Sequence, residues 1–336
     1  MRKLLKELCC LDGASGAEST VAEYIIGKIK DKCEYSIDPL GNIIAFKKGM
    51  KTPKNKIMLD AHMDEVGLII THVCDDGMLK FTTVGGIDIS VLLAKRVRIG
   101  KTVGVITFKP VHLTDEESRK EYPQKDSLCI DIGALNKQDA EKFVRPGDIA
   151  CFDTEYVENG DRILAKAIDD RSGCAQLIQL LNEESEYDFY AVFSVQEEVG
   201  LRGARVSAYT VDPDYAIILE STTAADIAGV PESQKVCKVG EGVVISFMDG
   251  ATLYDRDLFE TALETAQKKD IKVQIKHGTS GGNNSGAIHL TRGGVKTVTL
   301  STPCRYIHSP CSVADFKDIE ASKQLAKALI GVCAEL

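Results

Sequence analysis

The sequence predicts an α/β domain interrupted by a β-rich insertion. Apolar runs of strand length alternate with amphipathic helical patterns up to residue 66 and again from residue 160. Over residues 67–159, strand-like segments alternate with glycine-containing turns, and helical signal is sparse. With 336 residues, the chain is long enough for a substantial core. We therefore expect a discontinuous α/β domain, 1–66 with 160–336, and an inserted β-rich domain, 67–159.

The first elements follow from hydrophobic spacing and turn chemistry. Leu4, Leu5 and Leu8 recur at helical spacing, and Gly41-Asn42 is a typical hairpin turn. The pattern predicts, in order, a helix over 2–10, an amphipathic helix capped by Ser15 or Ser19 and carrying Val21, Ile25, Ile26 and Ile29, a hairpin over 35–46, and a strand over 57–60.

The remaining elements divide between the insertion and the second part of the α/β domain. The insertion is expected to contain strands over 79–84, 96–99, 103–108 and 128–132. Its charged segment 115–125 is expected to be a mobile loop. After the insertion we expect strands over 163–168, 190–195, 216–219, 273–275 and 297–300, helices over 174–182, 252–268 and 315–330, and a glycine-rich turn over 278–286.

Composition narrows the class of protein. A formal net charge of -9 argues against nucleic acid as a partner, because phosphate binding requires a basic surface. The eleven cysteines are scattered, odd in number and without a CxxC pair, so we expect mostly buried thiols in a reducing compartment. No segment approaches the roughly 20 apolar residues of a membrane span. These observations predict a cytoplasmic protein that binds neither nucleic acid nor membrane.

Two of the predicted strands end on groups that suit a metal ion. The strand over 190–195 runs into Glu197 and Glu198, and two carboxylates beside a buried strand are costly to hold without a nearby cation. The strand over 57–60 runs into His62 and Asp64, where a carboxylate could hold the imidazole in the metal-binding tautomer. The alternatives are a solvated glutamate pair and a structural histidine.

Three further strand ends carry Asp169, Glu220 and His308. Asp169 could instead cap the following helix, since aspartate is favoured there. Open α/β sheets bind ligands at the carboxyl ends of their strands. Two histidines and four carboxylates suit Zn²⁺, Co²⁺ or Mn²⁺. Their number suggests two ions, each with one histidine and one carboxylate, a shared bridging carboxylate, and one carboxylate left as a base.

Five segments, taken together, resemble the M42 family of metallo-aminopeptidases, and the resemblance runs over nearly the whole chain in family order. They are DAHMDEVGLII (60–70), AKAIDDRSG (165–173), SVQEEVGLRGA (194–204), AIILESTTAAD (216–226) and RYIHSP (305–310). The resemblance implies a mixed-sheet zinc-exopeptidase domain of the phosphorylase/hydrolase-like type, with helices on both faces. It also implies a PDZ-like inserted dimerisation domain, and dimers that build a dodecamer.

The same resemblance implies a role for each candidate residue. The function implied is hydrolysis of N-terminal residues from short peptides, with a metal-bound water as nucleophile and two divalent ions, zinc before cobalt or manganese. Asp169 would bridge the ions, His62 and Glu220 would complete one site, Glu198 and His308 would complete the other, Glu197 would be the general base, and Asp64 would orient His62.

Two positions depart from the family pattern. The family often has aspartate where Glu220 stands, and its Gly-Gly-Thr-Asp turn is here Gly-Gly-Asn283-Asn284. The second change removes a carboxylate, which leaves substrate preference open. Other readings are a metal-dependent deacylase of N-acyl amino acids and a non-catalytic assembly of the same fold. A glycanase fits less well, because glycoside hydrolysis normally uses paired carboxylates without metals.

Overall fold

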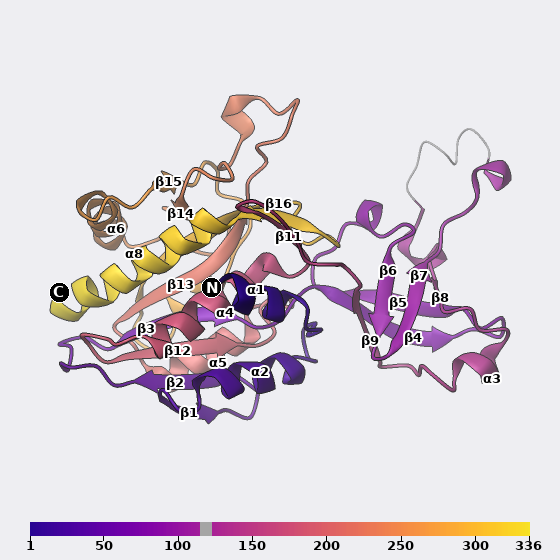
Figure 1. The fold of residues 1–336 in the computed structure, drawn as a ribbon, viewed down its shortest axis with the longest axis horizontal. Helices are drawn as coiled ribbons and strands as arrows, with labels where there is room; N and C mark the ends of the chain where they lie inside the picture. The colour runs from indigo at the N-terminus through magenta and orange to yellow at the C-terminus, as the bar shows by residue number, and fades with distance from the viewer. Residues whose placement is uncertain (115–122) are drawn as a thin grey trace.

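The computed structural model describes residues 1–114 and 123–336, and Figure 1 shows two bodies side by side. The larger body is an α/β domain built on one mixed sheet, and the smaller is a β-barrel. Most of the charged segment 115–125, predicted to be a mobile loop, lies outside the described residues. In the part of the chain that is described, no helix combines the length and apolar character needed to cross a membrane.

The large sheet has eleven strands, nine of them in the order β1-β2-β12-β3-β13-β16-β17-β11-β10, with β14 and β15 attached through β16. The strands are β1 (Glu34–Ile37), β2 (Ile43–Lys47), β3 (Ile57–His62), β10 (Val157–Asn159), β11 (Arg162–Ala165), β12 (Phe189–Ser194), β13 (Tyr215–Thr223), β14 (Val243–Ile245), β15 (Val273–Ile275), β16 (Lys296–Arg305) and β17 (Ser312–Asp315).

Four neighbouring strands at the centre of this sheet, β12, β3, β13 and β16, are parallel. Their apolar runs are buried on both sides, which is typical of parallel sheets covered by helices. In register, Ser194 lies beside His62, and Glu220 lies beside Ser301. The carboxyl ends of all four strands therefore meet at one edge of the sheet.

Helices cover both faces of the sheet. They are α1 (Arg2–Cys9), α2 (Ser19–Ile29), α4 (Ile168–Asn182), α5 (Arg202–Val211), α6 (Arg256–Lys268), α7 (Ser285–Ile288) and α8 (Phe316–Glu335). The alternation of strand side chains separates two cores: Leu59 packs with α1, α2, α4, α6 and α8, and Met58 packs on the opposite face with α5 and α7. The expectation of an α/β mixed sheet with helices on both faces agrees with this arrangement.

The barrel closes in the order β4-β5-β8-β7-β6-β9 and has a core of its own. Its elements are β4 (Gly67–Val73), β5 (Leu79–Val84), β6 (Arg96–Ile99), β7 (Thr102–Ile106), β8 (Ile130–Asp131), β9 (Ile149–Phe152) and the short helix α3 (Lys137–Ala140); single 3₁₀ turns lie at Ile89–Val91, Val111–Leu113, Lys125–Ser127 and, in the large domain, Glu232–Gln234. We propose 67–159 as the inserted domain, with its last strand, β10, pairing onto the large sheet.

Several elements differ from the sequence expectation, and strands β4, β9, β14 and β17 are among those that were not predicted. Helix α5 was not predicted, because Gly203 was taken as a break in the pattern. A Cβ at Gly203 would lie 2.3 Å from the Val195 carbonyl oxygen and 2.3 Å from Asn42 Oδ1, so the glycine permits close packing at the start of a helix. Strand β13 was expected to end at Leu219, yet it continues to Thr223 because it stays paired with β16.

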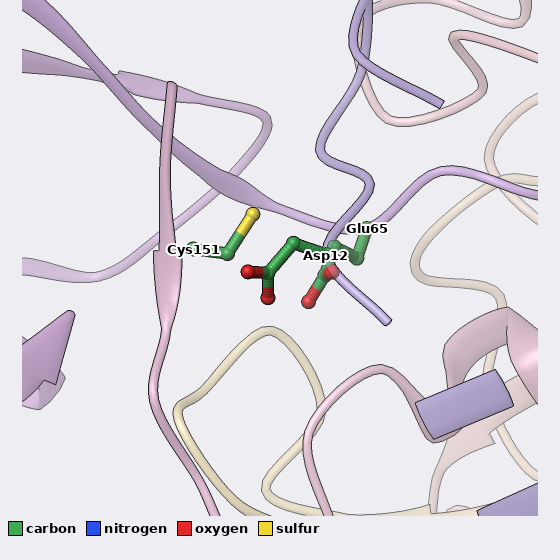
Figure 2. Close-up of side chains that lie close together, drawn as sticks. All are labelled: Asp12, Glu65 and Cys151. Carbon is green, nitrogen blue, oxygen red and sulfur yellow. The ribbon is translucent and has the colours of Figure 1, made fainter. Parts of the chain in front are cut away.

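A buried ionic cluster joins the two bodies (Figure 2). Asp12, Glu65 and the thiol of Cys151 lie close together there, in an arrangement that could hold a metal ion. The ammonium of Lys166 already lies 2.7 Å from Glu65 Oε1 and 2.8 Å from Asp12 Oδ1. Burial raises the pKa of the Cys151 thiol to about 12, so it stays protonated. We therefore interpret this cluster as a structural ion pair rather than a metal site.

Candidate metal centre and active site

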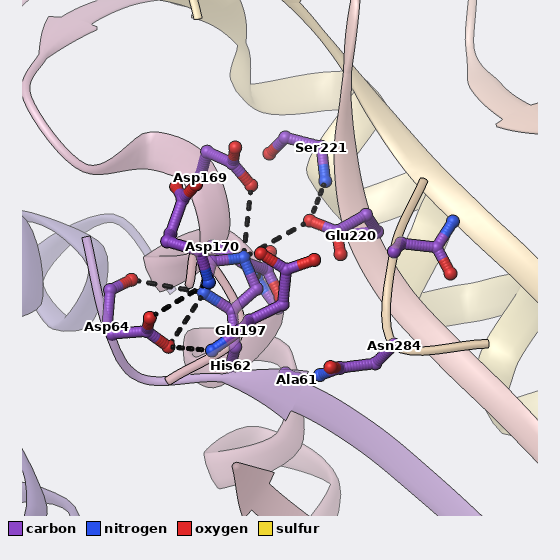
Figure 3. Close-up of polar contacts among 12 residues, drawn as sticks. Ala61, His62, Asp64, Asp169, Asp170, Glu197, Glu220, Ser221 and Asn284 are labelled. Carbon is purple, nitrogen blue, oxygen red and sulfur yellow. Dashed lines mark hydrogen bonds and ion pairs between the residues drawn. The ribbon is translucent and has the colours of Figure 1, made fainter. Parts of the chain in front are cut away.

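All five predicted metal ligands and Glu197 converge at the carboxyl edge of the parallel strands. Figure 3 shows His62, Asp169 and Glu220 together with Glu197. His62 ends β3, the two glutamates follow β12, and Glu220 lies near the end of β13. Asp169 lies in the first turn of α4, where its backbone is non-helical (φ -82°, ψ 111°) and turns away from the helix. His308 lies in the loop after β16 with a positive φ of 57°.

Asp169 lies between the two histidines. Its Oδ1 is 3.4 Å from His62 Nε2, and its Oδ2 is 3.4 Å from His308 Nε2. Each histidine has one further carboxylate: Glu220 Oε1 is 3.4 Å from His62 Nε2, and Glu198 Oε2 is 3.3 Å from His308 Nε2. The chain thus forms two groups, His62–Asp169–Glu220 and Asp169–Glu198–His308, that share one aspartate.

These spacings fit ligands around a metal ion better than hydrogen bonds. Ligand atoms about 2.0–2.1 Å from a tetrahedral zinc ion lie about 3.3–3.4 Å apart, whereas N–H···O hydrogen bonds are usually about 2.9–3.0 Å long. Two buried oxygens in the first group, Asp169 Oδ1 and Glu220 Oε2, have no hydrogen-bond partner within the described chain. Buried carboxylate oxygens are costly to leave unpaired, so the donor set fits a pair of divalent cations.

Asp64 is fully buried and holds both His62 and the glutamate loop. Its Oδ1 accepts a hydrogen bond from the Glu197 backbone N–H (3.0 Å), and its Oδ2 accepts one from the Glu198 N–H (3.1 Å) and one from the Ser15 hydroxyl (2.6 Å). His62 Nδ1 lies 3.1 Å from the Asp64 carbonyl oxygen and 3.4 Å from its carboxylate. The aspartate therefore fixes two strand ends relative to each other as well as the imidazole.

Glu197 lies close to one residue of each ligand group but belongs to neither of the two groups that share Asp169. It forms a third group with His62 and Glu198, in which one ligand atom of each lies within 4.8 Å of the others. Burial raises the pKa of Glu197 to about 7, and the negative charges of Asp169 and Asp64 add to the increase. A carboxylate with a pKa near neutrality, next to a metal centre, is suited to accept and return a proton.

Several buried supporting residues were not identified from the sequence. Asn284, one of the two departures from the family pattern, donates from Nδ2 to Asp60 Oδ1 (2.6 Å) and to the Ser194 hydroxyl (2.8 Å) beneath the site. Arg171 is fully buried and donates to the carbonyl oxygens of Met63 (2.8 Å) and Leu8 (2.7 Å). Their partners come from distant segments, so sequence spacing gave no sign of these roles.

A cavity of about 290 Å³ opens beside the metal centre. Its wall includes His62, Asp169, Glu197, Glu220 and His308, and continues along the segment from Lys276 to Asn283. A glycine-rich turn was predicted over 278–286, so most of this segment was expected to be a turn, and no role was predicted for Lys276. The sequence did contain one sign that Lys276 could line a cavity: this lysine lies directly after a short predicted strand and before a glycine-rich turn.

Known proteins resemble this chain over nearly its whole length. The model of the family described as M42 glutamyl aminopeptidase matches residues 41–325. A lysyl aminopeptidase from Pyrococcus furiosus is 34% identical to the chain, and the match covers 98% of this chain and 96% of that protein.

Solved structures show the same fold. An aminopeptidase from the archaeon Desulfurococcus kamchatkensis is 38% identical with a TM-score of 0.92, covering 98% of this chain and 93% of that one. The TET1 peptidase of Pyrococcus horikoshii, described as assembling into a tetrahedron or an octahedral shell, is 34% identical with a TM-score of 0.86, covering 98% of each chain. A protein described as an endoglucanase from Thermotoga maritima is 35% identical with a TM-score of 0.83, covering 98% of each. The chain belongs to the M42 family of peptidases.

Proposed function

We propose that this protein is a di-metal aminopeptidase that removes N-terminal residues from short peptides. The observation that carries the proposal is the position of Asp169 midway between two histidines, each with its own second carboxylate. Such a shared carboxylate is the arrangement expected for two metal ions about 3.5–4 Å apart. Relatives named as aminopeptidases support the choice of peptide substrates.

In this proposal, His62 and Glu220 would hold one ion, Glu198 and His308 would hold the other, and Asp169 would be shared between them. Zinc is the expected ion, with cobalt or manganese as alternatives, since the ligands are nitrogen and oxygen. When bound, the two ions would supply Lewis acidity for the scissile carbonyl and would lower the pKa of a water molecule toward about 7.

The chain itself supplies the proton transfer and the positioning. Glu197 takes the proton of the attacking water and passes it to the leaving amine. Asp64 keeps Glu197 in place through the backbone N–H at 3.0 Å, so the carboxylate does not have to reorganise during the reaction. The free amino terminus of the substrate would bind at the metal centre, which accounts for cleavage at the N-terminal residue.

A glycanase activity is disfavoured by the same geometry. Glycoside hydrolysis normally relies on two carboxylates that flank the sugar without a metal. Here Asp169, Glu198 and Glu220 each lie against a histidine in a metal-binding arrangement. The relative described as an endoglucanase therefore does not change the proposal.

We also propose that the chain forms a homo-oligomer through its barrel, which the family resemblance describes as a PDZ-like dimerisation domain. The barrel exposes several large apolar side chains, which favours burial against a partner: Val103, Val105, Phe108, Leu113, Leu135 and Phe143. A dodecamer as the full assembly is supported by a structure described as a PhTET1 dodecamer, and the TET1 peptidase of Pyrococcus horikoshii is described as forming a tetrahedron or a large octahedral shell. Particle mass measured in solution tests this, and a monomer at micromolar concentration would contradict it.

A panel of aminoacyl-p-nitroanilides and their N-acetylated counterparts tests the activity. With Zn²⁺, Co²⁺ or Mn²⁺ supplied, we expect cleavage of the unblocked substrates alone, and loss of activity with EDTA. Hydrolysis of the N-acyl bond of acylated amino acids would instead identify a deacylase. No turnover with any metal would support a non-catalytic assembly.

A further inference from the structure

The turn after strand β12 carries both the candidate base, Glu197, and a candidate ligand, Glu198. Where the strand ends, its backbone N–H groups need other acceptors, because a buried N–H group without a partner is costly. Gln196 adds to this demand, since its φ of 55° lies in the left-handed region that residues with a side chain rarely adopt. The groups that hold this turn therefore determine where the two glutamate side chains lie.

Four consecutive backbone N–H groups of the turn, at residues 195–198, are each accepted by a side-chain oxygen from another part of the chain. The pairs are Val195 with Asn42 (2.9 Å), Gln196 with Glu18 (3.1 Å), Glu197 with Asp64 (3.0 Å) and Glu198 with Asp64 (3.1 Å). A run of adjacent backbone N–H groups is suited to bind an anion. Here two carboxylates of the chain itself, Glu18 and Asp64, bind three of the four groups.

Glu18 is a buried carboxylate to which the sequence analysis gave no role. It directly precedes helix α2, and only 7% of the residue is exposed. The oxygen that accepts from Gln196, Oε1, also accepts from the backbone N–H of Gly16 at 2.8 Å. Both partners are backbone groups, so the carboxylate ties its own segment to the turn after β12. Glu18 also lies outside residues 41–325, which the family model matches.

The segment that carries Glu18 is itself fixed against the residues that follow β3. The N–H of Gly13 donates to Glu65 Oε1 (3.1 Å), and the N–H of Glu65 donates to the carbonyl oxygen of Gly13 (3.0 Å). The Ser15 hydroxyl donates to Asp64 Oδ2 (2.6 Å). Glu18 and Asp64 therefore hold neighbouring N–H groups of the turn from two segments that are bonded to each other.

We propose that Glu18 is a positioning residue for the catalytic base. It holds the Gln196 N–H, and through this bond it keeps the Glu197 carboxylate at the place beside the metal centre from which it takes a proton. The inference rests on the proposed aminopeptidase function. Glu18 acts only through the backbone of the turn, and a misplacement of about 1 Å is enough to cost about 10²-fold in rate.

Two substitutions of Glu18 separate hydrogen bonding from packing. Glu18→Met fills a similar volume but has no oxygen, whereas Glu18→Gln keeps an oxygen that accepts the same bonds. With the best substrate of the aminoacyl-p-nitroanilide panel and metal-loaded protein, Glu18→Met should lower kcat by about tenfold to hundredfold and leave KM within about threefold. Glu18→Gln should keep kcat within about threefold of the wild-type value.

The melting temperature of the same samples distinguishes positioning from a purely structural role. A residue that only stabilised the fold would lower the melting temperature in Glu18→Met and leave kcat of the folded enzyme unchanged, and that result would overturn the proposal. An equal loss of kcat in Glu18→Gln and Glu18→Met would also overturn it, because acceptance of the N–H would then not matter. Glu23→Met, at an exposed position of the same helix, is the matched control and should leave kcat unchanged.

Hydrogen exchange separates this inference from the proposed reaction. In metal-loaded protein, the Gln196 amide should exchange at least about tenfold faster in Glu18→Met than in the wild-type protein, and at nearly the wild-type rate in Glu18→Gln. If no p-nitroanilide is cleaved but exchange changes in this way, the aminopeptidase function fails and the hold of Glu18 on the turn stands. If substrates are cleaved while kcat and exchange are the same in all variants, the function stands and the role of Glu18 fails.

Discussion

At the scale of single residues, Glu197 differs from the neighbouring carboxylates because its side chain is not paired with a histidine. Glu198, Glu220 and Asp169 each lie 3.3–3.4 Å from a histidine nitrogen, whereas the side chain of Glu197 has no such pairing in the described chain. Its backbone is nevertheless held by Asp64. A fixed carboxylate beside the ligands, but outside both bridged groups, is placed for proton transfer.

The variant Glu197→Gln should therefore separate proton transfer from metal binding. The amide has nearly the same shape but cannot accept the proton of the attacking water, so kcat should fall by about 10²–10⁴-fold. Metal content after dialysis should stay at the wild-type value, as measured by elemental analysis of the same sample. Wild-type turnover, or loss of an ion, would refute the assignment of Glu197 as general base.

His308→Ala tests the division of the ligands into two groups. Removing this imidazole leaves Asp169 and Glu198 to hold one ion, while His62, Asp169 and Glu220 are untouched. Elemental analysis should show about one ion lost per chain, since a site with two protein ligands binds weakly. His72→Ala, at an exposed position on β4, is the control and should retain all metal. Retention of both ions by His308→Ala would remove it from the ligand set.

At the scale of elements, the sequence could predict the site because parallel strands bring their carboxyl ends to one edge. Apolar runs ending on His62, Glu197 and Glu220 were therefore enough to predict a shared location. The partners that support the site could not be predicted this way. Asp60 meets Asn284 across 224 positions of the chain, and no local pattern encodes such a contact.

Helix α5 shows the limit of propensity rules. Gly203 lowers helical propensity, and local reasoning took it as a break. In the structure it lies against Val195 and Asn42, where no side chain fits. Close packing against the neighbouring strand and turn requires glycine at position 203, and helix α5 forms although glycine lowers its propensity.

Gly203→Ala should accordingly destabilise the protein. A Cβ would lie 2.3 Å from two oxygens, and forcing an extra methyl group into a packed site costs about 1–3 kcal/mol. The matched control is Gly27→Ala in α2, where a Cβ meets nothing within 4 Å and should stabilise by about 0.5–1 kcal/mol. Melting temperatures at equal metal loading should move in opposite directions. A Gly203→Ala protein as stable as Gly27→Ala would contradict this account.

At the scale of the whole molecule, a chain of charged groups connects the barrel to the metal centre. Arg98 on β6 of the barrel binds Asp12 through Nε (2.7 Å) and Nη2 (2.8 Å). Asp12 and Glu65 share the ammonium of Lys166, three residues before Asp169, which lies between the two histidines. Glu65 itself follows Asp64 directly. One chain of half-buried and buried charges therefore links the barrel to the loops that carry the candidate ligands.

Lys166→Met tests the importance of this connection. The methionine fills a similar volume but leaves the buried Glu65 carboxylate without its closest cation, which costs about 3–5 kcal/mol in comparable buried pairs. We expect the melting temperature to fall by roughly 5–10 °C. Lys51→Met, which removes a solvent-exposed pair with Glu186, is the control and should change stability by less than about 1 kcal/mol. The double variant with Glu65→Gln should recover part of the loss, because the buried carboxylate that lost the Lys166 ammonium is then replaced by a neutral amide. If the melting temperature of Lys166→Met equals that of the wild-type protein, the cluster does not hold the two bodies together.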